Sequence, residues 1–258
     1  MIDAKIFLED NLKLPIKTLI FRQVNSTNTL CKELSREFKN DLLVVALSQS
    51  EGKGRLGRSF FSPLNSGIYM SFLLHPHLCA ESSIKITTAA AVAAAKAIDS
   101  ISGKKSLIKW VNDIYLNNKK VCGILTEAGF SSVKQELDYA VLGIGINLYD
   151  PQNGFPEYIK DKAGSVFEMQ KPNIEKSLEF INEFTLRFLE IYNNFPDNSY
   201  MNEYRSRSFL IGKKISFIKD GKEFFGTVDS IDDNAQLRVK TPAGEITLLA
   251  GEVSVVKI

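Results

Sequence analysis

The chain has 258 residues, of which 44% are hydrophobic and 24% charged, as expected for one large globular domain or a large domain with a small one. Its net charge of +2 is too small to predict binding to nucleic acid or to a membrane surface. No apolar run reaches the roughly 18 residues of a membrane helix, and the N-terminus has no secretory-signal pattern, so we expect a cytoplasmic protein. Three scattered cysteines predict reduced thiols, and His75 with His77 alone makes a poor metal site.

Strand-like and helix-like patterns alternate over the first ~200 residues. The cluster Asn25-Ser26-Thr27-Asn28 predicts a helix start, because these side chains cap free backbone N–H groups. The alanine-rich segment 83–101 favours helix by composition, and apolar residues recur at helical spacing over 174–195. Asn117-Asn118 predicts a tight turn. The predicted strands are 17–24, 42–47, 67–74, 106–110, 114–116, 121–127 and 139–148.

The pattern changes from about Gly212, where short strands separated by turn residues predict a small β-barrel. These strands are 215–218, 224–231, 236–240 and 245–249. We therefore expect an α+β protein, with a mixed β-sheet packed against helices in residues 1–209 and a small barrel in 210–258. Segment 149–164 has no periodicity, and loops of this length are often functional.

The most informative motif is the basic loop, Gly52-Lys53-Gly54-Arg55-Leu56-Gly57-Arg58, which combines three cations with three glycines. The glycines permit tight turns and close approach of a ligand, and the cations predict that the ligand is an anion. The pattern also matches the dinucleotide fingerprint Gly-x-Gly-x-x-Gly, but no helix pattern or acidic residue follows at the required spacing. A solvated turn without function is the other alternative.

A second cluster, Lys109-Trp110-Val111-Asn112-Asp113, is followed closely by Lys119 and Lys120. A carboxylate beside an anion site suits Mg²⁺, although Lys109 and Asp113 alone could form an ordinary surface ion pair. In a third motif, Gly143-Ile144-Gly145-Ile146-Asn147, two glycines within a strand indicate either close approach of another group to the backbone or dense strand packing.

Taken together, these segments resemble the biotin–protein ligases, also called biotin–[acetyl-CoA-carboxylase] ligases. Five stretches occur in the family's order and at its spacing, and the C-terminal barrel is similar to the family's SH3-like domain, for which Gly251-Glu252-Val253-Ser254 is typical. The matching stretches are Ser26-Thr27-Asn28; Gln49 with the basic loop and Ser62-Pro63; Lys109 to Tyr115; Lys120 with Gly123-Ile124-Leu125-x-Glu127; and Gly143 to Asn147.

The resemblance implies a class II synthetase-like catalytic domain and a two-step reaction with ATP and Mg²⁺. Biotin is first activated to biotinyl-5′-AMP and is then transferred to a lysine of a biotin carboxyl carrier protein, such as the acetyl-CoA carboxylase subunit. We expect a monomer or homodimer. The chain starts at the catalytic domain without room for the helix-turn-helix of some members, so we expect no DNA binding.

The resemblance also implies a role for each matching residue. Lys120 and Arg55 are the implied catalytic residues, and Asp113 with Asn112 is implied to serve the metal and the nucleotide. The implied biotin-binding residues are Ser26, Thr27, Asn28, Gln49, Gly52, Lys53, Gly54, Arg55 and Lys120. The implied nucleotide-binding residues are Arg58, Phe60, Asn112, Asn147, Ala163 and Ser165.

Three residues depart from the family pattern: Lys53 replaces Arg, Phe60 replaces Trp and Val111 replaces Pro. Lys53 offers a point charge in place of a planar fork, which weakens the case for bidentate phosphate binding there. Two other functions remain open. A lipoate or octanoate ligase or transferase of the same superfamily would need a long apolar slot, and a non-enzymatic nucleotide- or RNA-binding protein would use the loop and barrel alone.

Overall fold

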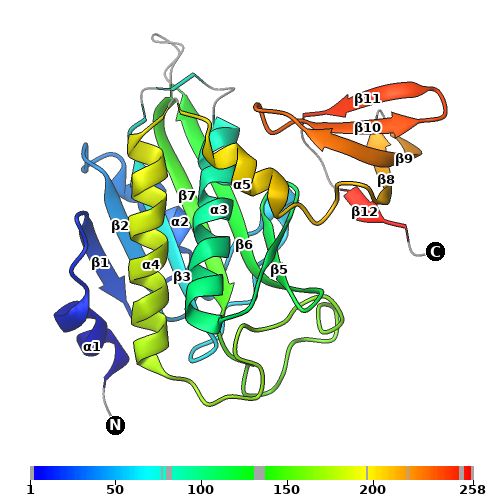
Figure 1. Cartoon of the computed structure of the whole chain (residues 1–258). Helices are drawn as coiled ribbons and strands as arrows, with labels where there is room; N and C mark the ends of the chain where they lie inside the picture. The colour runs from blue at the N-terminus through cyan, green and yellow to red at the C-terminus, as the bar shows by residue number, and fades with distance from the viewer. Residues whose placement is uncertain are drawn as a thin grey trace.

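The structure is a computed structural model that describes residues 3–76, 78–79, 83–130, 137–195, 197–219, 221–249 and 253–256. His77, Gly251 and Glu252, which were named above, lie outside these ranges. The described residues form two β-sheets, a large one covered by helices and a smaller one built from the last part of the chain (Figure 1).

The large sheet has seven strands in the order β1-β2-β3-β7-β6-β5-β4. Only β1 and β2 pair in parallel, so the sheet is mixed, as predicted. All seven predicted strands are present, although β6 extends three residues beyond its predicted end. The strands are β1 (Lys17–Phe21), β2 (Leu42–Ala46), β3 (Gly67–Leu74), β4 (Leu107–Lys109), β5 (Asp113–Leu116), β6 (Lys119–Phe130) and β7 (Leu137–Asn147).

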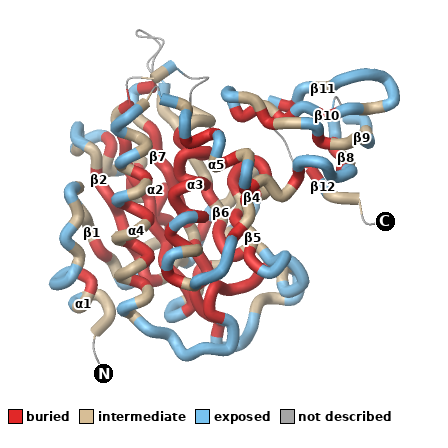
Figure 2. Tube along the Cα trace, in the orientation of Figure 1, coloured by how far each residue is buried: buried red, intermediate tan, exposed pale blue. Residues whose placement is uncertain are grey.

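Helices cover both faces of this sheet. The long helices α3 (Ser83–Ser102) and α4 (Ile174–Asn193) pack on one face, and α2 (Thr27–Leu34) lies on the other (Figure 1). Alternate residues of β2 therefore enter two cores: Leu43 belongs to the cluster under α3 and α4, and Leu42 to the cluster under α2. Because both faces are covered, β2 and β3 are buried along their whole length, which explains their continuous apolar sequences (Figure 2).

The composition of the two long helices sets how they pack. Small alanine side chains along α3 are fully buried, so this helix packs closely against both the sheet and α4, which lies beside it (Figure 1). Phe180, Phe184 and Phe188 follow at four-residue spacing along α4 and stack, with ring centroids about 6 Å apart. Phe72 of β3 packs against Phe184 and Phe188. Each buried phenylalanine contributes about 1.5–3 kcal/mol, so this stack is a main anchor of α4.

Two short helices were not predicted. In α1 (Ala4–Asn11), Asp3 caps the first turn by accepting from the backbone N–H groups of Lys5 and Ile6, and Leu8 is fully buried. In α5 (Tyr200–Ser206), Tyr204 is fully buried. Helices of seven or eight residues are marginal by themselves, so tertiary packing rather than a long periodic pattern stabilises them.

The smaller sheet is antiparallel throughout, with the order β11-β10-β9-β8-β12. Its strands are β8 (Lys214–Lys219), β9 (Lys222–Ile231), β10 (Leu237–Thr241), β11 (Gly244–Leu248) and β12 (Val253–Val255). The first four were predicted, and the three-residue β12 was not.

The two sheets meet at Trp110. Its ring is 4% exposed, and Nε1 donates to the carbonyl of Ala235, in a turn before β10, at 2.7 Å. Tyr204 of α5 donates to the carbonyl of Val111 at 3.0 Å. The smaller sheet and α5 therefore both hold the segment that precedes Asp113. Among the residues described, no helix has the length and apolar character needed to cross a bilayer.

Candidate functional site

The basic loop, residues 52–58, connects β2 to β3 and turns back on itself. The backbone N–H of Gly54 donates to Arg58 O at 2.7 Å, and that of Phe60 donates to Gly52 O at 2.8 Å. Leu56 and Gly57 both have positive φ, which closes the tip. A Cβ on Gly52 would lie 2.3 Å from Phe60 O, so only glycine fits there. The loop's conformation therefore depends on its glycines, as the sequence indicated.

The basic loop and the Lys109–Lys120 segment converge. Arg55 Nη1 donates to Asn112 Oδ1 at 2.8 Å, and Asn112 Nδ2 donates to the carbonyl of Ile124 on β6 at 2.8 Å. The Asn112 amide is thus fixed between the loop and the sheet. Next to it, Lys120 Nζ lies 2.6 Å from Asp113 Oδ1. The β5–β6 hairpin, which turns at Asn117 and Asn118 with positive φ as predicted, brings this pair together.

Side chains of the same chain occupy the space left by the glycines of β7. A Cβ on Gly143 would lie 2.0 Å from Asn28 Oδ1, and one on Gly145 would lie 2.6 Å from the Phe60 ring. The Phe60 ring also lies against Gly123 of β6, where a Cβ would be 3.0 Å from it. Close approach to the backbone was therefore the right expectation, and the approaching groups are Asn28 and Phe60.

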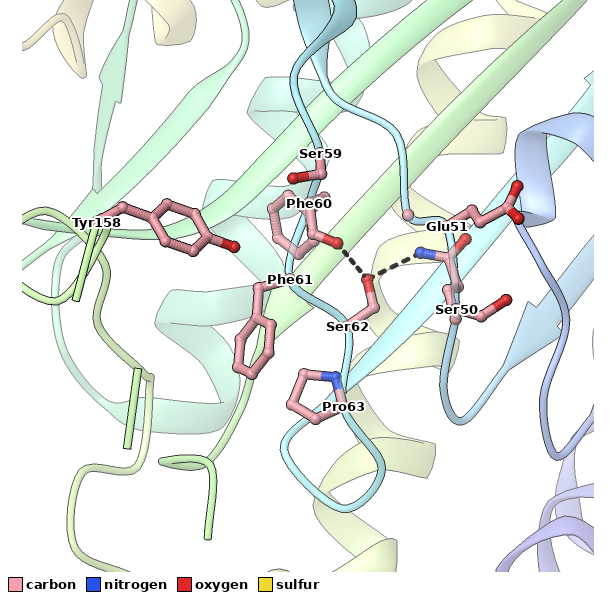
Figure 3. A pocket seen from close by; sticks show the side chains of 10 residues that line it. Ser50, Glu51, Ser59, Phe60, Phe61, Ser62, Pro63 and Tyr158 are labelled. Atoms are coloured by element: carbon pink, nitrogen blue, oxygen red, sulfur yellow. Dashed lines mark hydrogen bonds between the residues drawn. The ribbon is translucent and has the colours of Figure 1, made fainter. Parts of the chain in front are cut away.

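The start of α2 contacts Gln49, which lies three residues before the basic loop. Ser26 is the N-cap, accepting from the backbone N–H of Thr29. The backbone N–H and hydroxyl of Thr27 donate to Gln49 Oε1 at 2.8 and 3.1 Å. Gln49 Nε2 in turn donates to Ser62 Oγ at 3.0 Å (Figure 3). Thr27 and Gln49, 22 residues apart in the chain, are thus in contact. Together with Ser26 and Asn28 they form a polar wall.

Asn28 is 4% exposed, and each end of its amide has a partner. Its Nδ2 donates to Glu127 Oε2 at 2.8 Å, and its Oδ1 accepts from Ser71 Oγ at 2.6 Å. Lys32 Nζ also contacts Glu127, at 2.5 Å. Burial by itself raises the pKa of Glu127, but the hydrogen bonds from Lys32 and Asn28 and the charge of Lys53 lower it overall.

Two cavities flank the basic loop. The first, about 340 Å³, has cations and a carboxylate on its walls; its lining is Lys53, Gly54, Leu56, Gly57, Arg58, Leu125 and Glu127. The second, about 270 Å³, contains the aromatic rings of Phe60, Phe61 and Tyr158 (Figure 3). Its remaining lining is Gln49, Ser50, Glu51, Gly52, Ser59, Ser62 and Pro63. The loop thus separates a charged space from an aromatic one.

The long segment between β7 and α4 returns to Lys120. The backbone N–H of Lys120 donates to Lys162 O at 2.8 Å, and that of Gly164 donates to Lys120 O at 2.9 Å. Asn147 Nδ2 donates to Gly164 O at 3.0 Å. Ala163, which forms a bridge with Lys120, is buried.

Ser165 lies in the same segment, is 1% exposed and donates to Asp150 Oδ1 at 2.5 Å. The predicted nucleotide residues Asn147, Ala163 and Ser165 therefore gather beside Lys120. The Ser165 hydroxyl itself, however, points to Asp150.

The described residues offer little for a protein-bound metal or a cysteine nucleophile. No group of three or more His, Cys, Asp or Glu side chains occurs among them. Asp113 is a single carboxylate, which suits Mg²⁺ only where substrate phosphates complete the coordination. Burial raises the pKa of the Cys31 and Cys122 thiols far above the ordinary value, so neither thiol is a nucleophile at neutral pH.

Three residues of the polar network were given no role by the sequence analysis: Lys32, Ser71 and Glu127. Ser71 could have been noticed from the sequence, because it is the one small polar side chain among the apolar and aromatic residues of β3. Lys32 follows Asn28 by four residues, so the two share a helix face. Nothing local in the sequence predicts that Glu127, 99 residues from Asn28, completes the contact.

Comparisons with known proteins identify relatives of this chain. Residues 20–147 match the model of the biotin/lipoate A/B protein ligase family. The bifunctional ligase/repressor BirA of Bacillus subtilis (strain 168) is 30% identical over 247 residues, which are 92% of this chain and 75% of that protein. The biotin–[acetyl-CoA-carboxylase] ligase of Paracoccus denitrificans is 26% identical, covering 90% of this chain and 97% of the relative.

Among solved structures, the biotin protein ligase from Aquifex aeolicus in complex with biotin and ATP superimposes with a TM-score of 0.73. It is 24% identical and covers 94% of this chain and 99% of its own. At this identity the likeness establishes a shared fold.

Proposed function

Because this chain belongs to the biotin/lipoate A/B protein ligase family, we propose that it is a biotin–protein ligase. In the proposed reaction, a carboxylate oxygen of biotin attacks the α-phosphorus of ATP, the bond to the β-phosphate oxygen breaks, and pyrophosphate leaves. A lysine amine of the acceptor then attacks the acyl carbon of biotinyl-5′-AMP, AMP leaves and the amine loses a proton. Relatives named as biotin–[acetyl-CoA-carboxylase] ligases support this assignment.

The observation that carries the proposal is the hydrogen bond from Arg55 to Asn112, which joins the basic loop to the Lys109–Lys120 segment. Biotin and ATP are both anions, so their reacting atoms repel each other until nearby cations neutralise them. Arg55 and Lys120 come from separate segments that meet at this contact. Charged donors placed before the reaction are usually the largest electrostatic contribution to catalysis.

We assign Lys120 and Arg55 to the reacting carboxylate and α-phosphate. Lys120 is paired with Asp113, and both side chains are partly exposed, at 32% and 22%. An incoming anion would share the ammonium group with Asp113. Asp113 would then be available as one ligand of the Mg²⁺ that accompanies ATP, with the phosphates supplying others. Bound there, the metal would withdraw charge from the phosphates.

We assign the ring of biotin to the polar wall formed by Ser26, Thr27, Asn28 and Gln49, where Asn28 contacts Glu127 of the 340 Å³ cavity and Gln49 lines the 270 Å³ cavity. A cyclic urea offers both N–H donors and a carbonyl acceptor, and these side chains offer matching groups. A lipoyl or octanoyl chain has no such groups in its interior and would gain no hydrogen bonds from these side chains. Gly52, Lys53 and Gly54 would close over the ring from the basic loop. The polar character of these side chains therefore favours biotin over lipoate.

We assign the nucleotide to the aromatic side of the loop and to the segment that returns to Lys120. Phe60, Phe61 and Tyr158 supply flat faces for an adenine base. Arg58 is exposed at the end of the loop, where its guanidinium group would contact the triphosphate. Asn112, Asn147, Ala163 and Ser165 complete the proposed nucleotide site.

The remaining assignments concern the whole chain. We propose that residues 1–209 form the catalytic domain and residues 210–258 an SH3-like domain, since the two sheets share no strand. The proposed acceptor is a biotin carboxyl carrier domain of a biotin-dependent carboxylase. A requirement for ATP and the reduced state of Cys31 and Cys122 fit the cytoplasm.

The direct test is incubation of the purified chain with biotin, MgATP and a carrier domain, followed by an avidin blot. A carrier whose acceptor lysine is changed to arginine is the control. Parallel reactions with lipoate and octanoate, scored by mass spectrometry, decide between the two ligase activities. Biotin labelling that needs ATP and the acceptor lysine supports the proposal, and labelling with lipoate alone overturns it. Binding of an oligonucleotide without any ligase activity would favour the nucleic-acid alternative.

A further inference from the structure

Glu127 occupies a place in the site that the proposed chemistry does not use. It lies on β6, its side chain is 27% exposed, and its carboxylate lines the 340 Å³ cavity. Both of its oxygens are engaged by α2: Lys32 Nζ contacts Oε1 at 2.5 Å and Asn28 Nδ2 contacts Oε2 at 2.8 Å. Asn28 and Lys32 are one helical turn apart and therefore reach β6 together.

The Glu127 carboxylate is the nearer of two acceptors that orient the Asn28 amide, since Nδ2 also donates to the carbonyl of Leu125 at 3.4 Å. A carboxylate only accepts hydrogen bonds, so the amide must turn its NH₂ group toward Glu127 and its oxygen away. The oxygen then faces the Ser71 hydroxyl at 2.6 Å. With the amide reversed, two oxygens would face each other at the Glu127 end, an arrangement that a buried site does not tolerate.

The hydrogen bonds continue from Asn28 to Thr27 in the polar wall that we assign to the ring of biotin. Ser71 Oγ lies 2.7 Å from Thr27 Oγ1 as well as from Asn28, so the two acceptors share its single proton. The Thr27 hydroxyl donates onward to Gln49 Oε1 at 3.1 Å. A continuous set of hydrogen bonds thus joins Glu127 to Gln49, and from Ser71 the donors point toward Glu127 on one side and toward Gln49 on the other.

We propose that Glu127, held by Lys32, is a positioning residue that fixes the orientation of the Asn28 amide beside the ring of biotin. The inference rests on the proposed function. Glu127 acts through Asn28 and does not touch the reacting atoms. Its loss therefore weakens biotin binding while leaving ATP binding and the chemical step nearly unchanged.

The experiment exchanges the two interacting groups. Glu127→Gln removes the obligate acceptor, Asn28→Asp sets two carboxylates against each other, and the double variant re-creates a carboxylate–amide contact in the opposite order. For adenylate formation we expect KM for biotin to rise at least 10-fold in Glu127→Gln and about 100-fold in Asn28→Asp, since hydrogen bonds to charged groups are the strong ones. We expect KM for ATP and kcat to stay within about threefold. In the double variant, KM for biotin should fall at least 10-fold below that of Asn28→Asp.

A matched control is Glu179→Gln, which removes a carboxylate from a lysine ion pair (Lys176, 2.6 Å) on the exposed face of α4. It should leave both KM values unchanged. Circular dichroism and urea unfolding of every variant separate misfolding from altered binding, and Glu127→Asp tests partial rescue by a shorter carboxylate.

The inference is overturned if the double variant binds biotin no better than Asn28→Asp, or if Glu127→Gln raises the KM values for biotin and ATP equally. Dissociation constants for biotin, measured by calorimetry without turnover, give the same comparison independently of catalysis. A wild-type chain that binds biotin but makes no adenylate would overturn the proposed ligase function, and the calorimetric ratios would still decide the role of Glu127.

Discussion

Gly143→Ala tests the packing that joins α2 to the sheet. The new Cβ would lie 2.0 Å from Asn28 Oδ1 and 2.8 Å from Asn28 Cγ, so the Asn28 side chain must leave its place. The backbone of Gly143 does not have the positive φ that disfavours alanine, and the contact with Asn28 is therefore the source of the cost.

The magnitude follows from the hydrogen bonds that Asn28 would lose. The bond to the Glu127 carboxylate contributes about 1.5–3 kcal/mol and the bond from Ser71 about 0.5–1.5 kcal/mol. Alanine regains about 0.5–1 kcal/mol over glycine within a strand. We expect a net loss of about 1–4 kcal/mol in the free energy of unfolding. Typical domains have about 5–15 kcal/mol in total, so the variant should still fold.

Urea unfolding followed by circular dichroism measures this loss, and a double-mutant cycle identifies its cause. In an Asn28→Ala background the obstructing amide is absent, so Gly143→Ala should be neutral or stabilising by about 0.5–1 kcal/mol. An equal cost of Gly143→Ala in both backgrounds, or a cost below about 0.5 kcal/mol in the wild type, would refute the reasoning.

Three further predictions follow from other contacts. Lys120→Ala should slow adenylate formation about 10²–10³-fold in a pyrophosphate-release assay, while Lys119→Ala, at its exposed neighbour, should have little effect; near-normal release in the first variant would contradict the assigned role. Trp110→Phe keeps an aromatic ring but leaves the buried Ala235 carbonyl without its 2.7 Å donor, and urea unfolding should show a loss of about 1–3 kcal/mol. Because the folded-state pKa of Glu127 is lowered, its carboxylate stabilises the protein above the ordinary value of 4.5, and this stabilisation is lost as pH falls through the lowered value. The stability gap between wild type and Glu127→Gln should therefore be full at pH 7 and should close below pH 4.5; a gap independent of pH would argue against the ion pair.

The elements that were predicted correctly are those whose patterns are local. Ser26 caps α2 as expected, because a serine before a helical pattern satisfies a backbone N–H within the same turn. The strand Gly67–Leu74 was predicted with its observed bounds, since a continuous apolar run between polar residues is typical of a strand covered on both faces. The helices α1 and α5 were missed because tertiary packing rather than a local pattern stabilises them, whereas α2, also of eight residues, was indicated by its capping cluster.

The same distinction between local patterns and long-range contacts applies to the candidate site. The basic loop was recognised from its own seven residues, since glycines and cations at close spacing predict an anion site wherever the loop lies. Its neighbours were not predictable in this manner. Trp110 contacts a turn 125 residues away, and Asn28 contacts Glu127 across 99 residues. Such partners depend on which strands become adjacent in the sheet.

By itself, the sequence determined the types of element, the separate run of short strands at the C-terminal end and the charged groups that indicate an anion site, because each of these depends on residues that are neighbours in the chain. Only the tertiary structure decided that the side chains of Asn28 and Phe60 fill the space over Gly143 and Gly145. It also decided that Arg55 meets Asn112. The physical reason is that pairing of β6 with β7 and of β7 with β3 decides which residues of these three strands face α2 and the basic loop, and a shift of one residue would turn a strand's side chains to the opposite face.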